Sequence, residues 1–147
     1  MNNKKGFTLI EVLLVVAIIA IIAGIVILAV NPKKQLDESN DARRRADVNT
    51  ILNGVYQYVI DNGGRVPSAI LGTTTQICAT GASSTQCTPF GLVDLGFLSD
   101  RYIVSVPIDP LGATTTDGTG YYIEKTVGNR IRVSAPASAT STISATR

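Results

Sequence analysis

The feature that most constrains this chain is an apolar run from Phe7 to Val30, FTLIEVLLVVAIIAIIAGIVILAV, in which Glu11 is the only ionisable residue. As an α-helix, a run of about 24 residues would extend roughly 36 Å, which is long enough to cross the hydrocarbon core of a bilayer. The whole chain has 147 residues, so the remainder has room for one domain of ordinary size and little more. We therefore expect a membrane-spanning N-terminal helix followed by a single small domain.

The residues on either side of the apolar run bear on its orientation and fate. Lys4 and Lys5 precede it and favour a cytoplasmic N-terminus, although Lys33 and Lys34 on the far side weaken that preference. A cleavable secretory signal is the first alternative, but its apolar core has about 7–15 residues and ends in a small-residue cleavage pattern, which is missing here. A plain anchor helix fits the length. It leaves Glu11 unexplained, because an acidic residue in hydrocarbon costs about 2.5–3.5 kcal/mol on insertion scales and usually has a partner or a function.

The start of the apolar run carries a specific motif, the sequence KKGFTLIE at residues 4–11. This motif resembles the processing site of type IV pilins and pseudopilins. In that family a dedicated aspartic membrane peptidase cuts after the glycine and methylates the new amino terminus. The resemblance therefore implies that residues 1–6 form a leader peptide, that the chain is cut between Gly6 and Phe7, and that the mature protein begins at N-methyl-Phe7. The hydrophobic helix, residues 7–32, would stay on the mature protein.

The same resemblance implies partners and locations. The precursor would be a single-pass protein of the inner membrane with a cytoplasmic N-terminus, in contact with membrane lipid, the prepilin peptidase and an inner-membrane assembly platform. After processing, identical subunits would stack helix on helix into a helical filament, either an extracellular pilus or a periplasmic pseudopilus. Such a subunit is structural and has no catalytic residues.

Glu11 acquires a role once the chain is cut. Cleavage creates a cationic amine on Phe7, four positions away along the helix, and each charge is poorly placed in lipid alone. A carboxylate that meets the Phe7 amine of an adjacent subunit would neutralise both charges in a low-dielectric filament core and would fix the axial stagger between helices. Phe7 and Glu11 are therefore the expected assembly residues. The alternative is that Glu11 pairs with its own amine or with water near the lipid headgroups.

A second, amphipathic helix is expected over residues 33–64. Gly24 and Pro32 weaken helical structure near its start, so bending or local melting is expected there. The helix should end at residues 62–64, Asn-Gly-Gly, because Asn and Gly adopt the left-handed conformation that closes a helix. Between these limits an apolar stripe recurs at helical spacing. Its members are Val48, Ile51, Leu52, Val55, Tyr58 and Val59.

The charged start of this helix contains two pairs of opposite charge at i and i+4, Asp41 with Arg45 and Arg43 with Asp47. Both pairs can close within one helix, where each would contribute a few tenths of a kcal/mol. The simpler interpretation is a solvated helix face. The alternative is contact with neighbouring subunits in a filament.

Residues 65–90 are expected to form a connecting loop, because Gly, Ser, Thr and Pro occur throughout, and this loop contains both cysteines, Cys78 and Cys87. The N-terminus directs the chain out of the cytoplasm, where a disulfide is favoured over a metal site. Closing a loop of about 10 residues would contribute nearly 3 kcal/mol by the chain-entropy relation. We expect the disulfide, with two free thiols as the alternative.

Residues 91–135 are rich in strand-forming segments and predict a small antiparallel sheet. The segments are Gly91–Leu98, Tyr102–Val106, Tyr121–Val127 and Arg130–Ala135. The last two are joined through Gly128 and Asn129, which favour a two-residue hairpin turn. The apolar face of this hairpin can cover the helix stripe. The expected fold is therefore α+β, with the long N-terminal helix packed on a small antiparallel sheet, as in the pilin family.

The tail, residues 136–147, consists mainly of Ser, Ala and Thr with one proline. Such a composition cannot bury enough apolar surface to fix its backbone. We expect the tail to be loose or modified.

The residue inventory argues against an enzyme. The chain has no histidine, which removes the usual general base, the commonest zinc ligand and every triad that needs imidazole. Phosphate-binding glycine motifs and a nucleophile elbow are missing from the sequence. The 13 basic residues include Lys4 and Lys5, so the mature chain would carry equal numbers of basic and acidic side chains. No specific nucleic acid is therefore expected as a partner.

Asp109 and Asp117 lie in one turn-rich loop and are weak candidates for a calcium site. The pseudopilins of secretion systems, which this layout resembles, carry calcium in a comparable loop. Calcium takes about 6 to 8 oxygen ligands, so backbone carbonyls and water would have to supply most of them. Ordinary Asx turns are the simpler interpretation, and we expect no cofactor or metal, with calcium as the alternative.

Three functions fit these features. The first is a structural subunit of an extracellular pilus-like filament, which the Ser/Thr-rich exterior and the mid-chain disulfide favour. The second is a pseudopilin of a type II secretion system, which the short mature chain and the loop at residues 107–110 favour. The third is a membrane-anchored surface protein that binds a partner without polymerising, which would leave Glu11 and the Gly6–Phe7 junction unexplained.

Overall fold

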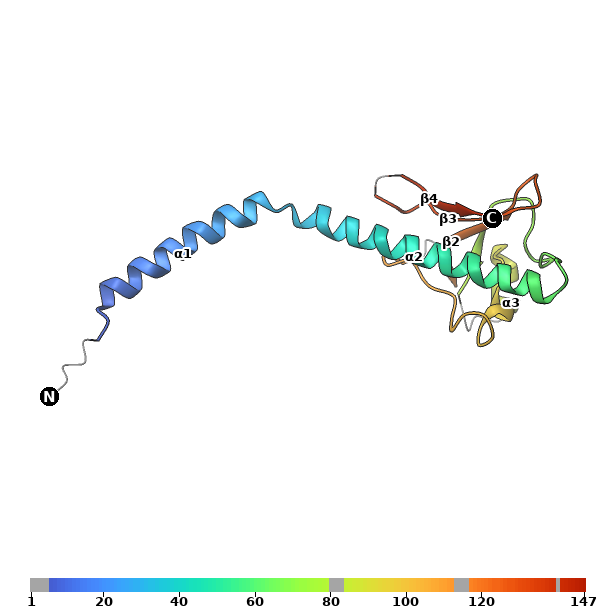
Figure 1. Ribbon diagram of the computed structural model, residues 1–147, viewed down its shortest axis with the longest axis horizontal. Coiled ribbons are helices and arrows are strands. Elements are labelled where there is room, and N and C mark those ends of the chain that lie inside the picture. The colour runs from blue at the N-terminus through green and yellow to red at the C-terminus, as the bar shows by residue number, and fades with distance from the viewer. Residues whose placement is uncertain (1–5, 80–83, 113–116, 140) are drawn as a thin grey trace. The chain divides into compact units, whose positions relative to one another are not determined.

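The structure is a computed structural model that describes residues 6–79, 84–112, 117–139 and 141–147 (Figure 1). The chain divides into two compact units, residues 1–36 and residues 37–147. The first unit contains an apolar helix and the start of a second helix. The second unit is a head in which the rest of that helix packs against a four-stranded antiparallel sheet, which confirms the expected α+β class.

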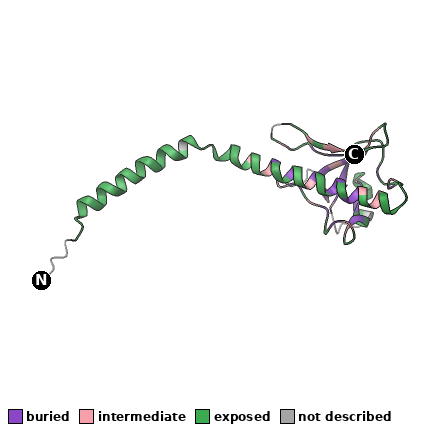
Figure 2. Cartoon of the chain, in the orientation of Figure 1, coloured by how far each residue is buried: buried purple, intermediate pink, exposed green. Residues whose placement is uncertain are grey.

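Helix α1 spans Leu9–Ala29 and consists of Leu, Ile, Val, Ala and Gly apart from Glu11. Apolar side chains therefore surround the helix, and no polar face develops. All its described side chains are exposed, as the colouring of α1 in Figure 2 shows. Gly24 lies inside α1 without ending it, and the helical structure is interrupted at residues 30–31. The interruption directly precedes Pro32, which disfavours helical backbone in the residue before it.

Helix α2 spans Pro32–Asp61, and its two ends follow from the sequence. Pro32 takes the first helical position, where its missing N–H leaves no hydrogen bond unmade. The Asn31 side chain accepts a hydrogen bond from the Lys34 N–H at 3.2 Å. At the other end, Gly63 has a φ of 66°, and the Gly64 N–H bonds back to a carbonyl five residues earlier at 2.8 Å. This is the Schellman motif, and it confirms the predicted helix end.

Four strands form one antiparallel sheet in the order β1-β2-β3-β4, and they span Thr75–Cys78, Gly118–Lys125, Ile131–Ala135 and Ile143–Thr146. The register places Thr75 opposite Ile123, Ile123 opposite Val133, and Val133 opposite Ala145. Side chains alternate between the two faces of a strand, so these four residues form a row on one face. Ile123 and Val133 are buried there.

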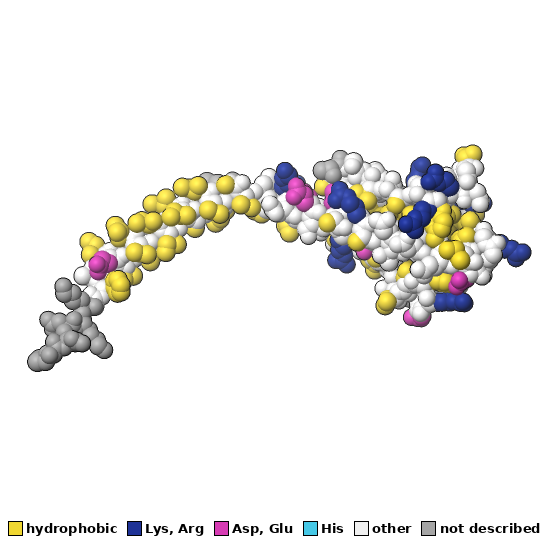
Figure 3. All heavy atoms as spheres, viewed as in Figure 1, with side chains coloured by type: hydrophobic (Ala, Val, Ile, Leu, Met, Phe, Trp, Pro, Cys, Tyr) yellow, Lys and Arg dark blue, Asp and Glu magenta, His cyan; other side chains and the backbone are white. Residues whose placement is uncertain are grey.

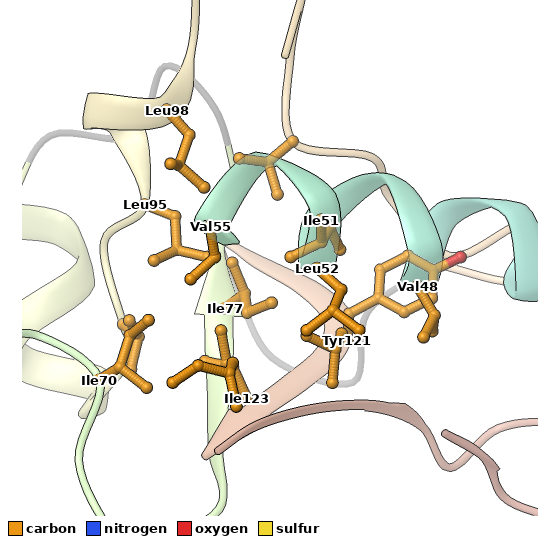
Figure 4. Packing of buried hydrophobic residues seen from close by; sticks show 14 of the residues in the cluster. Val48, Ile51, Leu52, Val55, Ile70, Ile77, Leu95, Leu98, Tyr121 and Ile123 are labelled. Carbon is orange, nitrogen blue, oxygen red and sulfur yellow. The ribbon is translucent and has the colours of Figure 1, made fainter. Parts of the chain in front are cut away.

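The hydrophobic core lies between α2 and the sheet. Four residues of the predicted helix stripe, Val48, Ile51, Leu52 and Val55, are at most 2% exposed, and Tyr58 and Val59 are partly buried beside them. Figure 4 labels the four fully buried helix residues together with core residues from the sheet and loops, Ile70, Ile77, Leu95, Leu98, Tyr121 and Ile123. The apolar stripe predicted from the sequence is therefore the helix side of the core.

The prediction of strands at Gly91–Leu98 and Tyr102–Val106 is wrong. These segments contain the 3-10 helix η2 at Gly96–Leu98 and isolated bridges instead. Two short helical elements, α3 at Ser84–Cys87 and η1 at Thr88–Phe90, precede them. The N–H groups of Tyr102 and Ile103 both bond to the Leu98 carbonyl, which folds the backbone into a turn. The apolar residues of this segment are nevertheless buried as a strand would bury them, because the turn packs closely on Gly54 of α2. A Cβ added to Gly54 would lie only 2.9 Å from the side chain of Ile103.

The β2–β3 hairpin lies where the sequence predicts it, but its turn differs. The Thr126 N–H bonds to the Arg130 carbonyl at 2.7 Å, and the Asn129 N–H bonds to the Thr126 carbonyl at 2.9 Å. Asn129 rather than Gly128 has the positive φ, 58°. The loop therefore has three residues with Asn in the left-handed position, in place of the expected two-residue turn.

Two strands lie in segments that were expected to be irregular. Strand β1 falls within the connecting loop at residues 65–90, and β4 falls within the tail, so the expectation of a loose tail is wrong for residues 143–146. Backbone pairing holds the chain end here: Arg147 and Ile131 exchange hydrogen bonds at 2.8 and 3.0 Å. The prediction from the composition of the tail considered only the burial of apolar side chains, and composition does not reveal backbone pairing.

Candidate functional site

The expected processing junction, Gly6–Phe7, lies just ahead of α1. Both residues are exposed, Phe7 to 90%, and neither is part of the helix. The next residue, Thr8, has extended backbone with φ −81° and ψ 151°. The peptide bond that the prepilin motif marks is therefore on an exposed, non-helical segment.

Glu11 caps its own helix. The Thr8 N–H donates to the Glu11 carboxylate at 2.8 Å, and the Glu11 N–H donates to the Thr8 hydroxyl at 3.3 Å. This reciprocal pattern is the capping box, with Thr8 as N-cap and Glu11 at the third helical position. Thr8 was not among the residues predicted from the sequence, although the spacing Thr-x-x-Glu before an apolar run is the signature of a capping box. In the single chain, therefore, Glu11 has hydrogen-bond donors before any neighbouring subunit is present.

The rest of α1 presents a continuous apolar surface. One stretch among the described residues, Leu9–Ile27, is long and apolar enough to cross a membrane by length and composition, with a mean hydropathy of 3.2. Figure 3 shows hydrophobic side chains covering the visible face of this helix. None of the residues in the stretch is buried within the chain.

Comparison with known proteins supports the same assignment for this end of the chain. Residues 1–27 match the family model for the prokaryotic N-terminal methylation motif. No curated protein and no solved structure matches the chain. The chain thus carries the prepilin signature of type IV pilins and pseudopilins, a structural family, which confirms the resemblance drawn from KKGFTLIE.

The head contains a buried ionic cluster that was not predicted from the sequence. Arg44 is 1% exposed and binds both carboxylate oxygens of Asp109, through Nε at 2.7 Å and Nη2 at 2.8 Å. Its Nη1 donates to Asp41 at 2.9 Å. Asp41 also accepts from the Ala139 N–H at 3.2 Å, so the cluster joins α2, the loop before β2 and the tail. Arg44 and Asp109 are 65 positions apart in the sequence, which explains why no local pattern revealed them.

The electrostatics of this cluster favour its charged form. Burial by itself would raise the pKa of Asp109, but hydrogen bonds from Arg44 and from the Leu111 N–H outweigh burial and lower it. The hydrogen bond to Asp109 raises the pKa of Arg44 against the opposing effect of burial. Gly120 in β2, with a φ of 83°, permits the loop that carries Asp109 to approach β2 closely, because a Cβ added to Gly120 would lie 2.8 Å from the Asp109 Cβ.

The predicted helix ion pairs are formed only in part. Arg43 and Asp47 lie 3.9 Å apart, at the limit of an ion pair. Arg45, the expected partner of Asp41, is exposed, and Arg44 takes its place at i+3. Asp47 also accepts a hydrogen bond at 2.7 Å from the hydroxyl of Tyr121, whose pKa is raised by burial and by this carboxylate.

The two weak calcium candidates, Asp109 and Asp117, have different surroundings. Both oxygens of Asp109 are bound by Arg44, so a cation would have to compete with a guanidinium. Asp117 is half-buried with a φ of 62°, which is the left-handed turn conformation that Asp tolerates. In the part of the chain that the structure describes, no three acidic, Cys or His side chains gather where they could hold a metal ion.

Cys78 and Cys87 form a disulfide, with their Cα atoms 5.8 Å apart. Both residues are at most 2% exposed. The bond ties the end of β1 to α3 and so fixes one edge of the sheet to the loop that follows it. This agrees with the disulfide expected from the sequence.

Proposed function

We propose that the chain is the structural subunit of an extracellular type IV pilus-like filament, assembled by helix packing after cleavage behind Gly6. The observation that carries the proposal is the surface of α1, which is apolar on all sides, exposed, and located directly behind a processing motif. Fully burying one Val, Leu or Ile side chain is worth about 1.5–3 kcal/mol. A helix with this surface therefore needs lipid around it before assembly and other protein around it afterwards.

Glu11 makes the transfer from lipid to filament favourable. Before cleavage its carboxylate accepts a hydrogen bond from the Thr8 N–H. Cleavage adds a positive amine at Phe7, and in a filament core no water is present to solvate that amine. Pairing of Glu11 with the Phe7 amine of an adjacent copy neutralises both groups and sets how far the two helices are displaced.

The precursor would reside in the inner membrane as a single-pass protein with a cytoplasmic N-terminus. Its partners would be membrane lipid, the prepilin peptidase, an inner-membrane assembly platform and finally identical subunits. The prepilin motif and the apolar helix at Leu9–Ile27 support this passage from the membrane to the filament.

A pseudopilin of a type II secretion system is the alternative filament subunit. The loop at residues 107–110, which precedes β2 in a head with one small sheet, favours it. A non-polymerising surface protein is a further alternative, but it gives the processing motif and Glu11 no role.

Shearing of cells followed by mass spectrometry tests the proposal. The sheared fraction should contain the chain, beginning at N-methyl-Phe7, and Gly6→Val should leave an uncut precursor in the membrane. An intact Gly6–Phe7 bond in assembled filaments would rule the processing out, and a chain that stays in the membrane fraction would favour the surface protein. Electron microscopy of cells with and without the gene distinguishes long surface pili from a pseudopilus.

A further inference from the structure

The two edges of the sheet in the head differ in how they are covered. On the side of β1 away from β2, the Cys78 N–H donates to the Val93 carbonyl at 2.8 Å, and the Val93 N–H donates to the Gln76 carbonyl at 2.9 Å. The segment around Val93 therefore occupies this edge. The other edge is β4, which pairs with β3 on one side and has no strand on its other side among the described residues (Figure 1).

The ladder between β3 and β4 shows which backbone groups of β4 point to this open edge. Arg147 and Ile131 exchange two hydrogen bonds, and the residue pairs of an antiparallel ladder alternate between bonded and non-bonded pairs. Counting back from this pair, Ser144 and Thr146 belong to the non-bonded pairs. Their N–H and C=O groups therefore point away from β3, and in the described ranges none of these groups bonds to another element.

The sequence of β4 contains no feature that blocks pairing at this edge. Natural sheets protect an open edge with lysine, proline, a bulge or an inward-pointing charge. Strand β4 reads Ile-Ser-Ala-Thr, without charge or proline, and its register with β3 is regular. The strand therefore offers a row of unpaired donors and acceptors to an extended segment of another chain, which is the basis of β-strand addition.

A groove of about 350 Å³ lies beside β4. Its walls are three residues of α2, Arg45, Val48 and Asn49, and residues 141–145 of the tail. Arg45 is exposed, is the one ionisable residue in the described lining, and forms no ion pair with another described residue, because Arg44 occupies Asp41. The groove therefore presents a positive charge without a counter-charge next to the open backbone of β4.

We propose that the edge of β4 and this groove bind an extended segment of a different protein, which joins the four-stranded sheet as a further strand and carries an acidic side chain to Arg45. Backbone hydrogen bonds to Ser144 and Thr146 supply affinity, and the groove selects the side chains at alternate positions of the segment. Charge complementarity favours an acidic partner. A second copy of this chain fits less well, because pairing of β4 with β4 brings another Arg45 to the groove and no acid from its described lining.

A synthetic peptide tests the site on the full-length protein in detergent micelles, without any need for filament assembly. The probe is a fluorescent peptide of about seven residues, Thr-Val-Thr-Glu-Thr-Val-Thr, whose Val and Glu side chains share one face of a strand. Fluorescence anisotropy should show saturable binding. Ser144→Pro should weaken binding about fivefold or more, because proline removes an N–H that points to the open edge and leaves the bonds to β3 in place.

Ser144→Ala is the matched control, since it keeps the N–H and should bind the peptide like the wild type. Thr146→Pro repeats the test at the other outward N–H, in case Ser144→Pro lowers the unfolding midpoint. Arg45→Glu should weaken binding of the Glu peptide about threefold and should instead favour the same peptide with Lys in place of Glu.

Three results would overturn the proposal. The first is a wild-type chain that does not bind the Glu peptide, or binding that both proline variants leave unchanged. The second is an Arg45→Glu variant that still prefers the Glu peptide, which contradicts an acidic partner. The third is a wild-type chain that self-associates in micelles and loses this association on Ser144→Pro, which assigns the edge of β4 to a second copy.

Discussion

At the scale of single residues, the head is organised around a buried cation. Arg44 is the largest fully buried side chain in the described part of the head, and three hydrogen bonds to two carboxylates satisfy it. Such an ion pair adds little net stability over an apolar replacement of the same volume, but removing one partner leaves an uncompensated charge that costs about 3–5 kcal/mol. The ion pair therefore contributes conformational specificity, because it favours the one position of the loop before β2 in which Asp109 meets Arg44 of α2.

Asp109→Asn should destabilise the head by about 3 kcal/mol, because it leaves Arg44 buried with Asp41 alone. Acid should have the same effect on the wild type. The folded pKa of Asp109 lies below its ordinary value of 3.8, so its contribution is complete above the unfolded pKa and is lost as the pH falls through the folded value. Urea unfolding of full-length protein in detergent micelles, followed by circular dichroism from pH 7 to pH 2, measures both effects.

Asp117→Asn is the matched control, since Asp117 lies in the same loop region and has no ion pair within the described residues. It should unfold like the wild type at neutral pH. An Asp109→Asn variant with the wild-type midpoint would show that the Arg44 cluster does not hold the head together.

At the scale of secondary-structure elements, the sequence predicted what depends on local pattern. The apolar stripe of α2 and its Gly63–Gly64 end are periodic or local features, and both are found. Strand β4 was missed because only two apolar residues, Ile143 and Ala145, alternate with Ser and Thr in this segment, and because the strand is held by backbone pairing with β3. The Arg44–Asp109 pair was missed because it joins residues that only the tertiary fold brings together.

Deletion of residues 141–147 tests the role of β4. The loss of its hydrogen bonds to β3 and of the partly buried Ile143 and Ala145 should lower the unfolding free energy by about 2 kcal/mol or more. Arg147→Ala is the control, because it removes only the side-chain contacts to Asn53 and Tyr56. Equal unfolding midpoints for the deletion and the wild type would mean that β4 does not stabilise the head.

The disulfide fixes the other edge of the sheet. Denatured but unreduced protein from shed material should take up no alkylating reagent at Cys78 or Cys87, and reduction should expose both thiols and lower stability by up to about 3 kcal/mol. Cys78→Ser provides the reference for one labelled thiol per chain. Full labelling of both cysteines without reduction would show that the bond does not form in the cell.

At the scale of the whole molecule, the chain separates two tasks. The head folds on its own core between α2 and the sheet, whereas α1 has no apolar partner among the described residues and must find one outside the chain. Stability of the head and assembly of the proposed filament should therefore respond to different substitutions. Changes in the Arg44 cluster act on the first, and changes at Phe7 or Glu11 act on the second.

Glu11→Gln separates these tasks most directly. Glutamine also completes a capping box with Thr8, so helix α1 should still begin correctly, and the head should fold and the precursor be cut as in the wild type. Only the negative charge is lost. In a filament the Phe7 amine would then be buried without a counter-charge, at a cost of about 3–5 kcal/mol for each subunit. Filament yield should fall sharply while the processed chain accumulates in the membrane.

Immunoblots of the membrane and sheared fractions measure this partition, and mass spectrometry checks that the membrane-retained chain begins at N-methyl-Phe7. Thr8→Val is the control, because it removes the cap and keeps the charge of Glu11; it should reduce yield less than Glu11→Gln. Wild-type amounts of Glu11→Gln filament would show that the carboxylate is satisfied by Thr8, by its own amine or by water throughout. Pairing between subunits would then have to be abandoned as the force that draws α1 out of the membrane.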